Sequence, residues 1–134
     1  AAGRRPVLGI AECGLAHALT RGARFGIIAL SPASIERQKR LVRQMGLQDH
    51  YAGSHAVNAS AGETANPDIR SRLQEAGRNL VENRGADVVV MGCAGMASHG
   101  RALETALGVP VVEPTQQATI AAMGRLLLEM NKDG

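Results

Sequence analysis

Aromatic residues are almost missing from this 134-residue chain, which has one phenylalanine, one tyrosine and no tryptophan. Its core must therefore be aliphatic. Proteins that bind single-stranded nucleic acids use aromatic side chains as stacking platforms. The basic residues behind the net charge of +3 are also spread along the chain instead of forming one dense stripe. We predict no nucleic-acid partner, whereas the positive charge suits an acidic small molecule. The basic residues between 37 and 43 are predicted to form the solvated face of a helix.

Long apolar runs are missing as well. No segment reaches the roughly 18–20 apolar residues that a membrane span needs, so we predict no membrane partner. The opening "AAGRRPVLGI" has basic residues but only a short apolar stretch, unlike a signal peptide. The only cysteines, Cys13 and Cys93, leave a disulfide possible. The lack of secretory features favours reduced thiols and a cytoplasmic location. The length suits a single domain over residues 1–134.

Cofactor and metal motifs are also absent. Neither GxGxxG nor GxxxxGK[ST] occurs in the sequence, so no nucleotide cofactor is predicted. There is no CxxC or HxxxH spacing, and the four histidines are scattered. Metal ligands in proteins usually follow such spacings. We therefore predict a protein without a metal or a cofactor.

Short aliphatic runs, predicted to be buried strands, alternate with segments whose apolar residues recur at helical spacing. The strands are expected at 6–11, 24–30, 51–57, 86–92 and 109–113. The helices are expected at 12–22, 31–46, 66–85, 97–108 and 115–134. Ser31 before Pro32 and Asn66 before Pro67 are typical helix starts. This alternation predicts an α/β fold with a mainly parallel sheet, in which ligands bind at the carboxyl ends of the strands.

Three of the expected strand ends carry chemically useful side chains. They are Glu12 with Cys13, Ser31 with Ser34, and Gly92 with Cys93. Cys93 lies where "VVVMG" turns into a helix, and Gly92 and Gly95 allow a tight turn. N–H groups at a helix start attract anions and favour the thiolate form of a nearby cysteine. Cys93 is therefore a candidate base or nucleophile; the alternative is a small buried apolar residue.

The other candidate residues have less support. Cys13 can equally be a small residue in the first turn of a packed helix. His17 lies one turn after Cys13, so a Cys–His pair is geometrically possible. His99 follows Cys93 by six residues and could cap the helix or orient a substrate, but we expect it on the surface.

The stretch "VVVMGCAGM", followed by "LGVPVVEPTQQATIAA", resembles the aspartate/glutamate/hydantoin racemase superfamily. Within it the hydantoin and allantoin racemases look closest. "PVLGIAECGLAHAL" resembles the strand and helix that open the second half of those enzymes, and "RFGIIALSPAS" resembles their next strand and turn. The resemblance therefore covers nearly the whole chain and implies a Rossmann-like, three-layer lobe with a parallel sheet.

The resemblance also implies a chemistry. These enzymes invert a carbon beside a carbonyl without a cofactor. One cysteine thiolate removes the α-proton, and a second cysteine returns a proton to the opposite face. Cys93 resembles one of these acid/base residues, and Cys13 is a possible second thiol. The expected substrate-binding residues are Gly92, Ala94, Gly95, Met96, Ser31, Ser34 and Glu12. The expected substrate is a hydantoin, allantoin or an acidic amino acid, and the expected assembly is a homo-oligomer.

Members of the superfamily have two similar lobes, with the site in the cleft between them. This chain resembles the second lobe, and the lobe that carries the first catalytic cysteine is expected to be absent. Two alternatives follow. One is a decarboxylase of malonate-type acids, in which a single cysteine protonates the product. The other is a module without turnover that binds a small anion or a partner chain.

Overall fold

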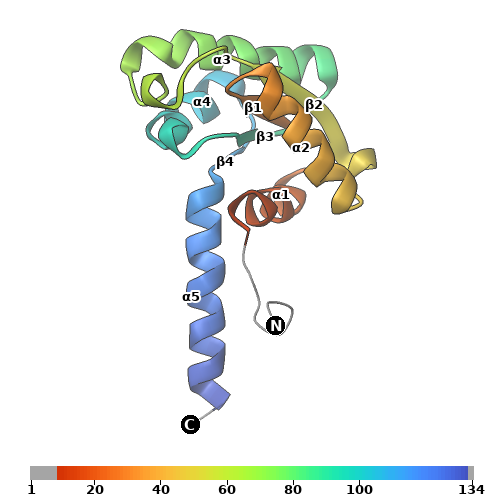
Figure 1. Ribbon diagram of the computed structural model, residues 1–134, viewed down its shortest axis with the longest axis vertical. Helices are drawn as coiled ribbons and strands as arrows, with labels where there is room; N and C mark the ends of the chain where they lie inside the picture. Colours follow the sequence, from red (N-terminus) through yellow and green to blue (C-terminus); the bar gives the residue numbers. More distant parts are fainter. Residues whose placement is uncertain (1–8, 133–134) are drawn as a thin grey trace.

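A computed structural model describes residues 9–132 of the protein as an α/β unit built on a four-stranded sheet (Figure 1). The strands are β1 (Phe25–Ala29), β2 (Tyr51–Ala56), β3 (Val88–Met91) and β4 (Val111–Val112). They lie in the order β2-β1-β3-β4, and every pair of neighbours is parallel. The predicted α/β fold with a parallel sheet is confirmed.

In the described part of the chain, five α-helices connect and cover these strands. They are α1 (Ile10–Arg21), α2 (Pro32–Gln44), α3 (Arg70–Arg78), α4 (Gly100–Leu107) and α5 (Pro114–Lys132). Short helical turns complete the connections: η2 (Gln48–His50), η3 (Ala61–Glu63), η4 (Pro67–Ile69), η5 (Asn79–Asn83) and η6 (Ala94–His99). In Figure 1, α3 and α4 lie on one side of the sheet, and α1 lies on the other.

The core has two halves because neighbouring strand residues point to opposite faces of the sheet. On β3, Val88 and Val90 pack with Leu15 of α1 and Val42 of α2. Val89 and Met91 of the same strand point to the opposite face. There they pack with apolar residues of α3, η5 and α4 in the second half of the core. The sheet is therefore covered on both faces, as the predicted three-layer lobe requires.

The helix starts follow local chemistry. The Ser31 hydroxyl accepts a hydrogen bond from the Ser34 N–H at the N-cap of α2, with Pro32 in the first helical position. The Asn66 side chain caps η4 in the same way, before Pro67. Both predicted caps are confirmed.

The strand expected at 6–11 is wrong where the structure describes it. Residues 6–8 lie outside the described part of the chain, and Ile10 and Ala11 already belong to α1, with Gly9 as the N-cap. A short apolar run does not distinguish a strand from the start of a buried helix. The Glu12 carboxylate in the first turn also favours the positive end of the helix dipole.

Asp87 joins the starts of the two central strands. Its carboxylate accepts hydrogen bonds from the backbone N–H groups of Ala23, at 3.0 Å, and Arg24, at 2.8 Å. These bonds stabilise the charged form, so they lower the pKa of Asp87 below its ordinary value, the Arg24 N–H having the largest effect. Asp87 thus helps to hold the starts of β1 and β3 together, and it does so most strongly when it is ionised.

Asp87→Asn should therefore destabilise the fold at neutral pH. Because the pKa of Asp87 is lower in the folded state, its contribution is fully present above the unfolded value of about 4 and disappears as the pH falls through the folded value. Asp87 is exposed to solvent, so we expect a loss of only about 1 kcal/mol at pH 7. Urea unfolding at a series of pH values measures it. Asp49→Asn, at an exposed site, is the control, and a gap between the two variants that persists in strong acid would contradict the assignment.

Helix α5 leaves the body of the protein after packing its first turns on α1 (Figure 1). Pro114 approaches α1 so closely that a Cβ at Gly14 would lie 2.8 Å from its ring. From Ala122 to Asn131 every side chain of α5 is exposed. Nevertheless, no helix within residues 9–132 is both long and apolar enough to cross a membrane.

Most of the exposed apolar side chains of α5 share one face. At 100° per residue they fall within an arc of roughly 120°. We call this set the α5 stripe: Ile120, Met123, Leu126, Leu127 and Met130. Four of its members are spaced three, four and three residues apart, which is the spacing of a two-helix seam. An apolar stripe of this kind is rarely left in water.

We therefore expect the isolated chain to self-associate through the α5 stripe. Leu127, which is 59% exposed, lies at its centre. Leu127→Glu puts a charge into the seam and should shift the mass measured by light scattering towards that of the monomer. Ala122→Glu adds the same charge to an exposed site outside the stripe and should not. A wild-type chain that stays monomeric throughout the micromolar range would contradict this expectation.

Candidate active site

A cavity of about 430 Å³ opens at the carboxyl ends of β1 and β3, between α1, α2 and the start of α5. Parallel α/β sheets bind ligands at this edge. Apolar residues form most of its wall: Ile10, Ala11, Leu15, Ile27, Leu30, Leu41, Val90, Met91, Ala94 and Pro114. A smaller set of side chains brings polar atoms to the wall: Ser34, Arg37, Gln38, Cys93, Glu113 and Thr115.

Cys93 lies at the wall of this cavity, directly after β3, in extended backbone and at the N-cap of η6. Its position depends on Gly92. The Gly92 N–H donates to the Ile28 carbonyl at 2.8 Å, and a Cβ at Gly92 would lie only 2.3 Å from that oxygen. Glycine therefore allows the chain that leaves β3 to pass close to the backbone of β1 and to present the half-buried Cys93 thiol beside the strand end.

The glycine after Cys93 has a different role. A Cβ at Gly95 would lie 2.1 Å from the Thr64 hydroxyl, so Gly95 makes room for Thr64 behind the cavity wall. Met96 is fully buried in the core. Of the residues predicted around Cys93, Gly92 and Ala94 line the cavity, whereas Gly95 and Met96 do not.

The first turn of α2 brings both predicted serines close to the site. Their hydroxyls are 3.2 Å apart, and Arg37 donates to the Ser34 hydroxyl at 3.2 Å. Ser34 lines the cavity, and Ser31 does not. Arg37 was predicted to lie on the solvated face of this helix. Its side chain is exposed, as predicted, but it also lines the cavity. Its spacing of three residues from Ser34 puts both on one helix face.

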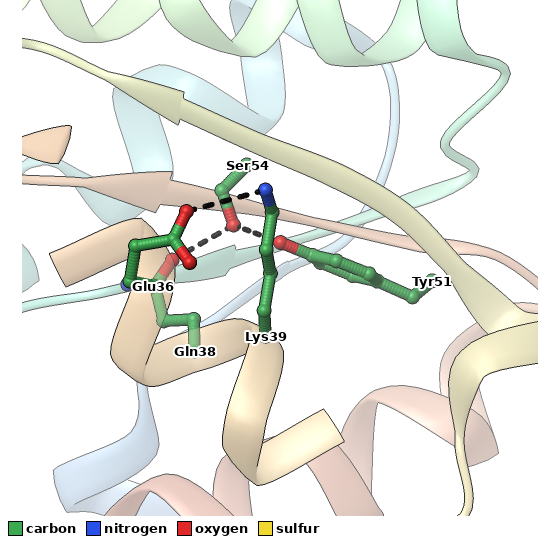
Figure 2. Close-up of polar contacts among 5 residues, drawn as sticks. All are labelled: Glu36, Gln38, Lys39, Tyr51 and Ser54. Atoms are coloured by element: carbon green, nitrogen blue, oxygen red, sulfur yellow. Dashed lines mark hydrogen bonds and ion pairs between the residues drawn. The ribbon is translucent and has the colours of Figure 1, made fainter. Parts of the chain in front are cut away.

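Gln38 is a cavity residue that our sequence analysis missed. The Ser54 hydroxyl of β2 donates to its side-chain oxygen at 2.8 Å, and the Tyr51 hydroxyl contacts Ser54 in turn (Figure 2). The other end of the amide faces Gly92, since a Cβ there would lie 3.0 Å from the Gln38 Nε2. The exposed Glu36–Lys39 ion pair, at 3.4 Å, lies on a neighbouring part of α2. Gln38 thus offers hydrogen-bond donors beside Gly92, the residue before Cys93.

Glu113 also lines the cavity, but its carboxylate has a structural partner. It accepts hydrogen bonds from the N–H groups of Thr115, at 2.9 Å, and Gln116, at 2.7 Å. Glu113 therefore caps the start of α5 and fixes that wall of the cavity.

Cys13 and Glu12 are not brought together with Cys93. Neither lines the cavity; Ile10, Ala11 and Leu15 form that face of α1. The Glu12 carboxylate instead lies over the start of its own helix, where a Cβ at Gly9 would be 2.7 Å from its oxygen. The expected strand at 6–11 would have put Glu12 and Cys13 at a strand end. Because α1 already begins at Ile10, Cys13 lies within the helix, on a face that does not line the cavity.

His99 is 1% exposed, so its expected surface position is wrong. Its Nε2 bonds to the Thr64 carbonyl at 2.8 Å, and Arg70 donates to its Nδ1 at 3.3 Å. The ring therefore ties η6 to the loop before α3. Both partners are far away in sequence, so the local pattern around His99 held no sign of them.

Chemically, this cavity presents one thiol, an amide, a guanidinium and an aliphatic wall. Within residues 9–132 no three His, Cys, Asp or Glu side chains come together as metal ligands. Cys93 can take up or release a proton on one face of a bound molecule. The opposite face holds no second cysteine from the described part of the chain.

Comparisons with known proteins agree on one family. The Asp/Glu/hydantoin racemase model matches residues 2–122. The hydantoin racemase of Paenarthrobacter aurescens is 33% identical over 116 residues, covering 85% of this chain and 49% of the relative. The chain thus spans about half the length of the curated racemases it matches.

Solved structures give the same result. The allantoin racemase from Klebsiella pneumoniae superposes with a TM-score of 0.85 and 26% identity, over 92% of this chain and 51% of that one. The allantoin racemase from Pseudomonas fluorescens has a TM-score of 0.84 and 21% identity, over 92% of this chain and 54% of that one. The second similarity concerns the fold alone.

Proposed function

The chain belongs to the Asp/Glu/hydantoin racemase family, and we propose that it supplies one acid/base cysteine, Cys93, for the cofactor-independent racemisation of a hydantoin-type substrate. The observation that carries this proposal is the Cys93 thiol at the wall of a 430 Å³ cavity, at the carboxyl edge of the sheet. Family membership supports the reaction class, and the cavity supports the residue.

The reaction needs a proton to leave a carbon beside a carbonyl and another to arrive from the opposite side. As thiolate, Cys93 takes the α-proton, and the electron pair of the C–H bond moves onto the carbonyl oxygen as an enolate. Hydrogen-bond donors near that oxygen lower the barrier, and the Gln38 amide, which lies beside Gly92, is placed to supply one. A thiol on the opposite face then protonates the carbon.

The cavity wall favours one substrate class over the others. A 5-substituted hydantoin is a small polar ring with carbonyl and N–H groups, carrying one side chain. The Gln38 amide and the Arg37 guanidinium suit its carbonyl groups, and the aliphatic wall suits an apolar substituent. Aspartate and glutamate carry two carboxylates and an ammonium group. Those charges fit less well on a wall that is mainly apolar.

Inversion by two thiols requires one on each face of the substrate, whereas Cys93 is the only thiol that the described residues bring to the cavity. We therefore expect this chain alone to exchange the α-proton of its substrate without inverting it. A second chain or a second lobe would supply the opposite thiol, and the homo-oligomer predicted from the sequence remains a prediction.

Proton NMR in D₂O tests the proposal. The panel is a 5-alkylhydantoin, allantoin, aspartate and glutamate, each with and without the chain. Loss of the α-proton signal and loss of optical rotation are followed separately. The expected result is exchange that is fastest for the alkylhydantoin, at nearly constant rotation. No exchange beyond that of the substrate alone would overturn the proposal.

A malonate-type decarboxylase is the second candidate. One cysteine suffices there, because the carbanion left by the departing carbon dioxide needs a proton from one side only. The single thiol beside an aliphatic wall favours it. Release of carbon dioxide from an arylmalonate, without exchange of any hydantoin, would select this function. Binding of an anionic ligand without either reaction would select the module without turnover.

A further inference from the structure

The residue behind Cys93 is Thr64. It is 0% exposed, and its hydroxyl lies 3.9 Å from the Cys93 sulfur. Cys93 lines the cavity and Thr64 does not. The Thr64 hydroxyl therefore contacts the sulfur from the protein interior and not from the cavity. Gly95 makes the approach possible, because any side chain at this position would collide with the Thr64 hydroxyl. This explains the second glycine of "GCAG".

The direction of the hydrogen bond follows from the other partner of Thr64. A hydroxyl has one hydrogen to donate and two lone pairs to accept with. The Thr64 hydroxyl donates its hydrogen to the Ala61 carbonyl at 2.7 Å. Only a lone pair then remains for Cys93, and a lone pair can accept from a thiol but repels a thiolate.

The backbone of Thr64 is held as firmly as its side chain. The buried His99 bonds to the Thr64 carbonyl at 2.8 Å, and Arg70 donates to the other ring nitrogen of His99. The Thr64 N–H donates to the Ala61 carbonyl. Thr64 therefore cannot easily turn its hydrogen towards the sulfur, because it would have to break a buried hydrogen bond.

We propose that Thr64 is a positioning residue: its hydroxyl accepts a hydrogen bond from the Cys93 thiol and so fixes how Cys93 presents its sulfur to the cavity. The inference rests on the proposed function only in taking Cys93 as an acid/base group. It adds a role for Thr64 behind that group.

The titratable and charged groups around the thiol have to stay constant in the test. Arg37 of α2 and Glu113 before α5 line the cavity with Cys93. Arg70 of α3 and His99 of η6 lie behind Thr64. A change confined to the Thr64 hydroxyl leaves all of them in place, so differences between variants report that hydroxyl.

The experiment is the pH dependence of alkylation of Cys93 by iodoacetamide, in a Cys13→Ala background so that only one thiol reacts. Thr64→Val removes the acceptor at nearly constant volume. We expect it to move the midpoint of alkylation to lower pH and to speed the reaction at pH 7 about three- to tenfold. Thr64→Ser keeps the hydroxyl and should stay close to the wild type.

A Raman measurement of the S–H stretch gives a readout that does not depend on reactivity. A thiol that donates a hydrogen bond has a lower stretching frequency, so Thr64→Val should raise it and Thr64→Ser should not. If Thr64→Val does not fold, the S–H stretching frequency of Cys93 is compared between folded and unfolded wild-type chain. A lower frequency in the folded chain supports the hydrogen bond to Thr64. Slower alkylation of Thr64→Val, or a wild-type S–H band at the unfolded frequency, overturns the proposal.

These results are independent of turnover. If no substrate exchanges its α-proton while Thr64→Val still shifts the alkylation midpoint, the proposed function fails and the role of Thr64 stands. If exchange depends on Cys93 but the midpoint does not move, the role of Thr64 fails and the function stands.

Discussion

Cys93→Ala should reduce α-proton exchange by at least a hundredfold, to the rate of the substrate in buffer, while Cys13→Ala keeps the wild-type rate within about twofold. A positioned acid/base group contributes about 10²–10⁴-fold to a proton transfer. Only Cys93 brings a thiol to the cavity, because Cys13 lies on another face of α1. The chain therefore contains its own matched control for any general effect of removing a cysteine.

The measurement is the first-order loss of the α-proton signal in D₂O at equal concentrations of folded protein. Circular dichroism and thermal melting verify that both variants fold. A Cys93→Ala variant that retains exchange would show that another group removes the proton. Loss of exchange in Cys13→Ala would show instead that the α1 thiol reaches the substrate after all, and the assignment of the two cysteines would have to be reversed.

The second large effect is expected from Gly92→Ala. The added methyl group would lie 2.3 Å from the Ile28 carbonyl oxygen, which is backbone and cannot turn away. The hydrogen bond from the Gly92 N–H to the same carbonyl, at 2.8 Å, prevents the strands from separating without loss. We expect the free energy of unfolding to fall by about 2–3 kcal/mol. Exchange should fall as well, because Cys93 follows Gly92 directly.

Gly62→Ala is the matched control. Gly62 lies in the exposed η3 turn, and a Cβ there would have no atom within 4 Å. Denaturant unfolding should show Gly62→Ala within about 0.5 kcal/mol of the wild type. If Gly92→Ala changes the free energy of unfolding equally little, the strands can accommodate a methyl group at this position. Glycine would then be required there only for the position of Cys93 and not for stability.

Much of the architecture could be predicted because it follows from local patterns. Aliphatic runs gave the strands, and Ser31 and Asn66, each before a proline, marked two helix starts. The first element was wrong over residues 9–11 because "PVLGIA" is too short to reveal its period. The close contact of Pro114 with Gly14 of α1 is tertiary, so the local pattern gave no sign of it.

The site was predicted only in part, for the same physical reason. Cys93 could be found because a thiol between glycines at a strand tip is a local pattern. Gln38 and Thr64 owe their places to partners elsewhere in the fold: Ser54 orients the first, and the buried His99 holds the second. In the sequence both look like ordinary polar residues.

The strand order β2-β1-β3-β4 also has a kinetic consequence. Phe25 pairs with Val88, so the two central strands meet only after roughly sixty intervening residues have been brought together. Parallel sheets that depend on such distant pairings fold more slowly than helical proteins, whose contacts are mostly local. The Ile28 carbonyl and Gly92 join in that step, so the cavity is assembled late.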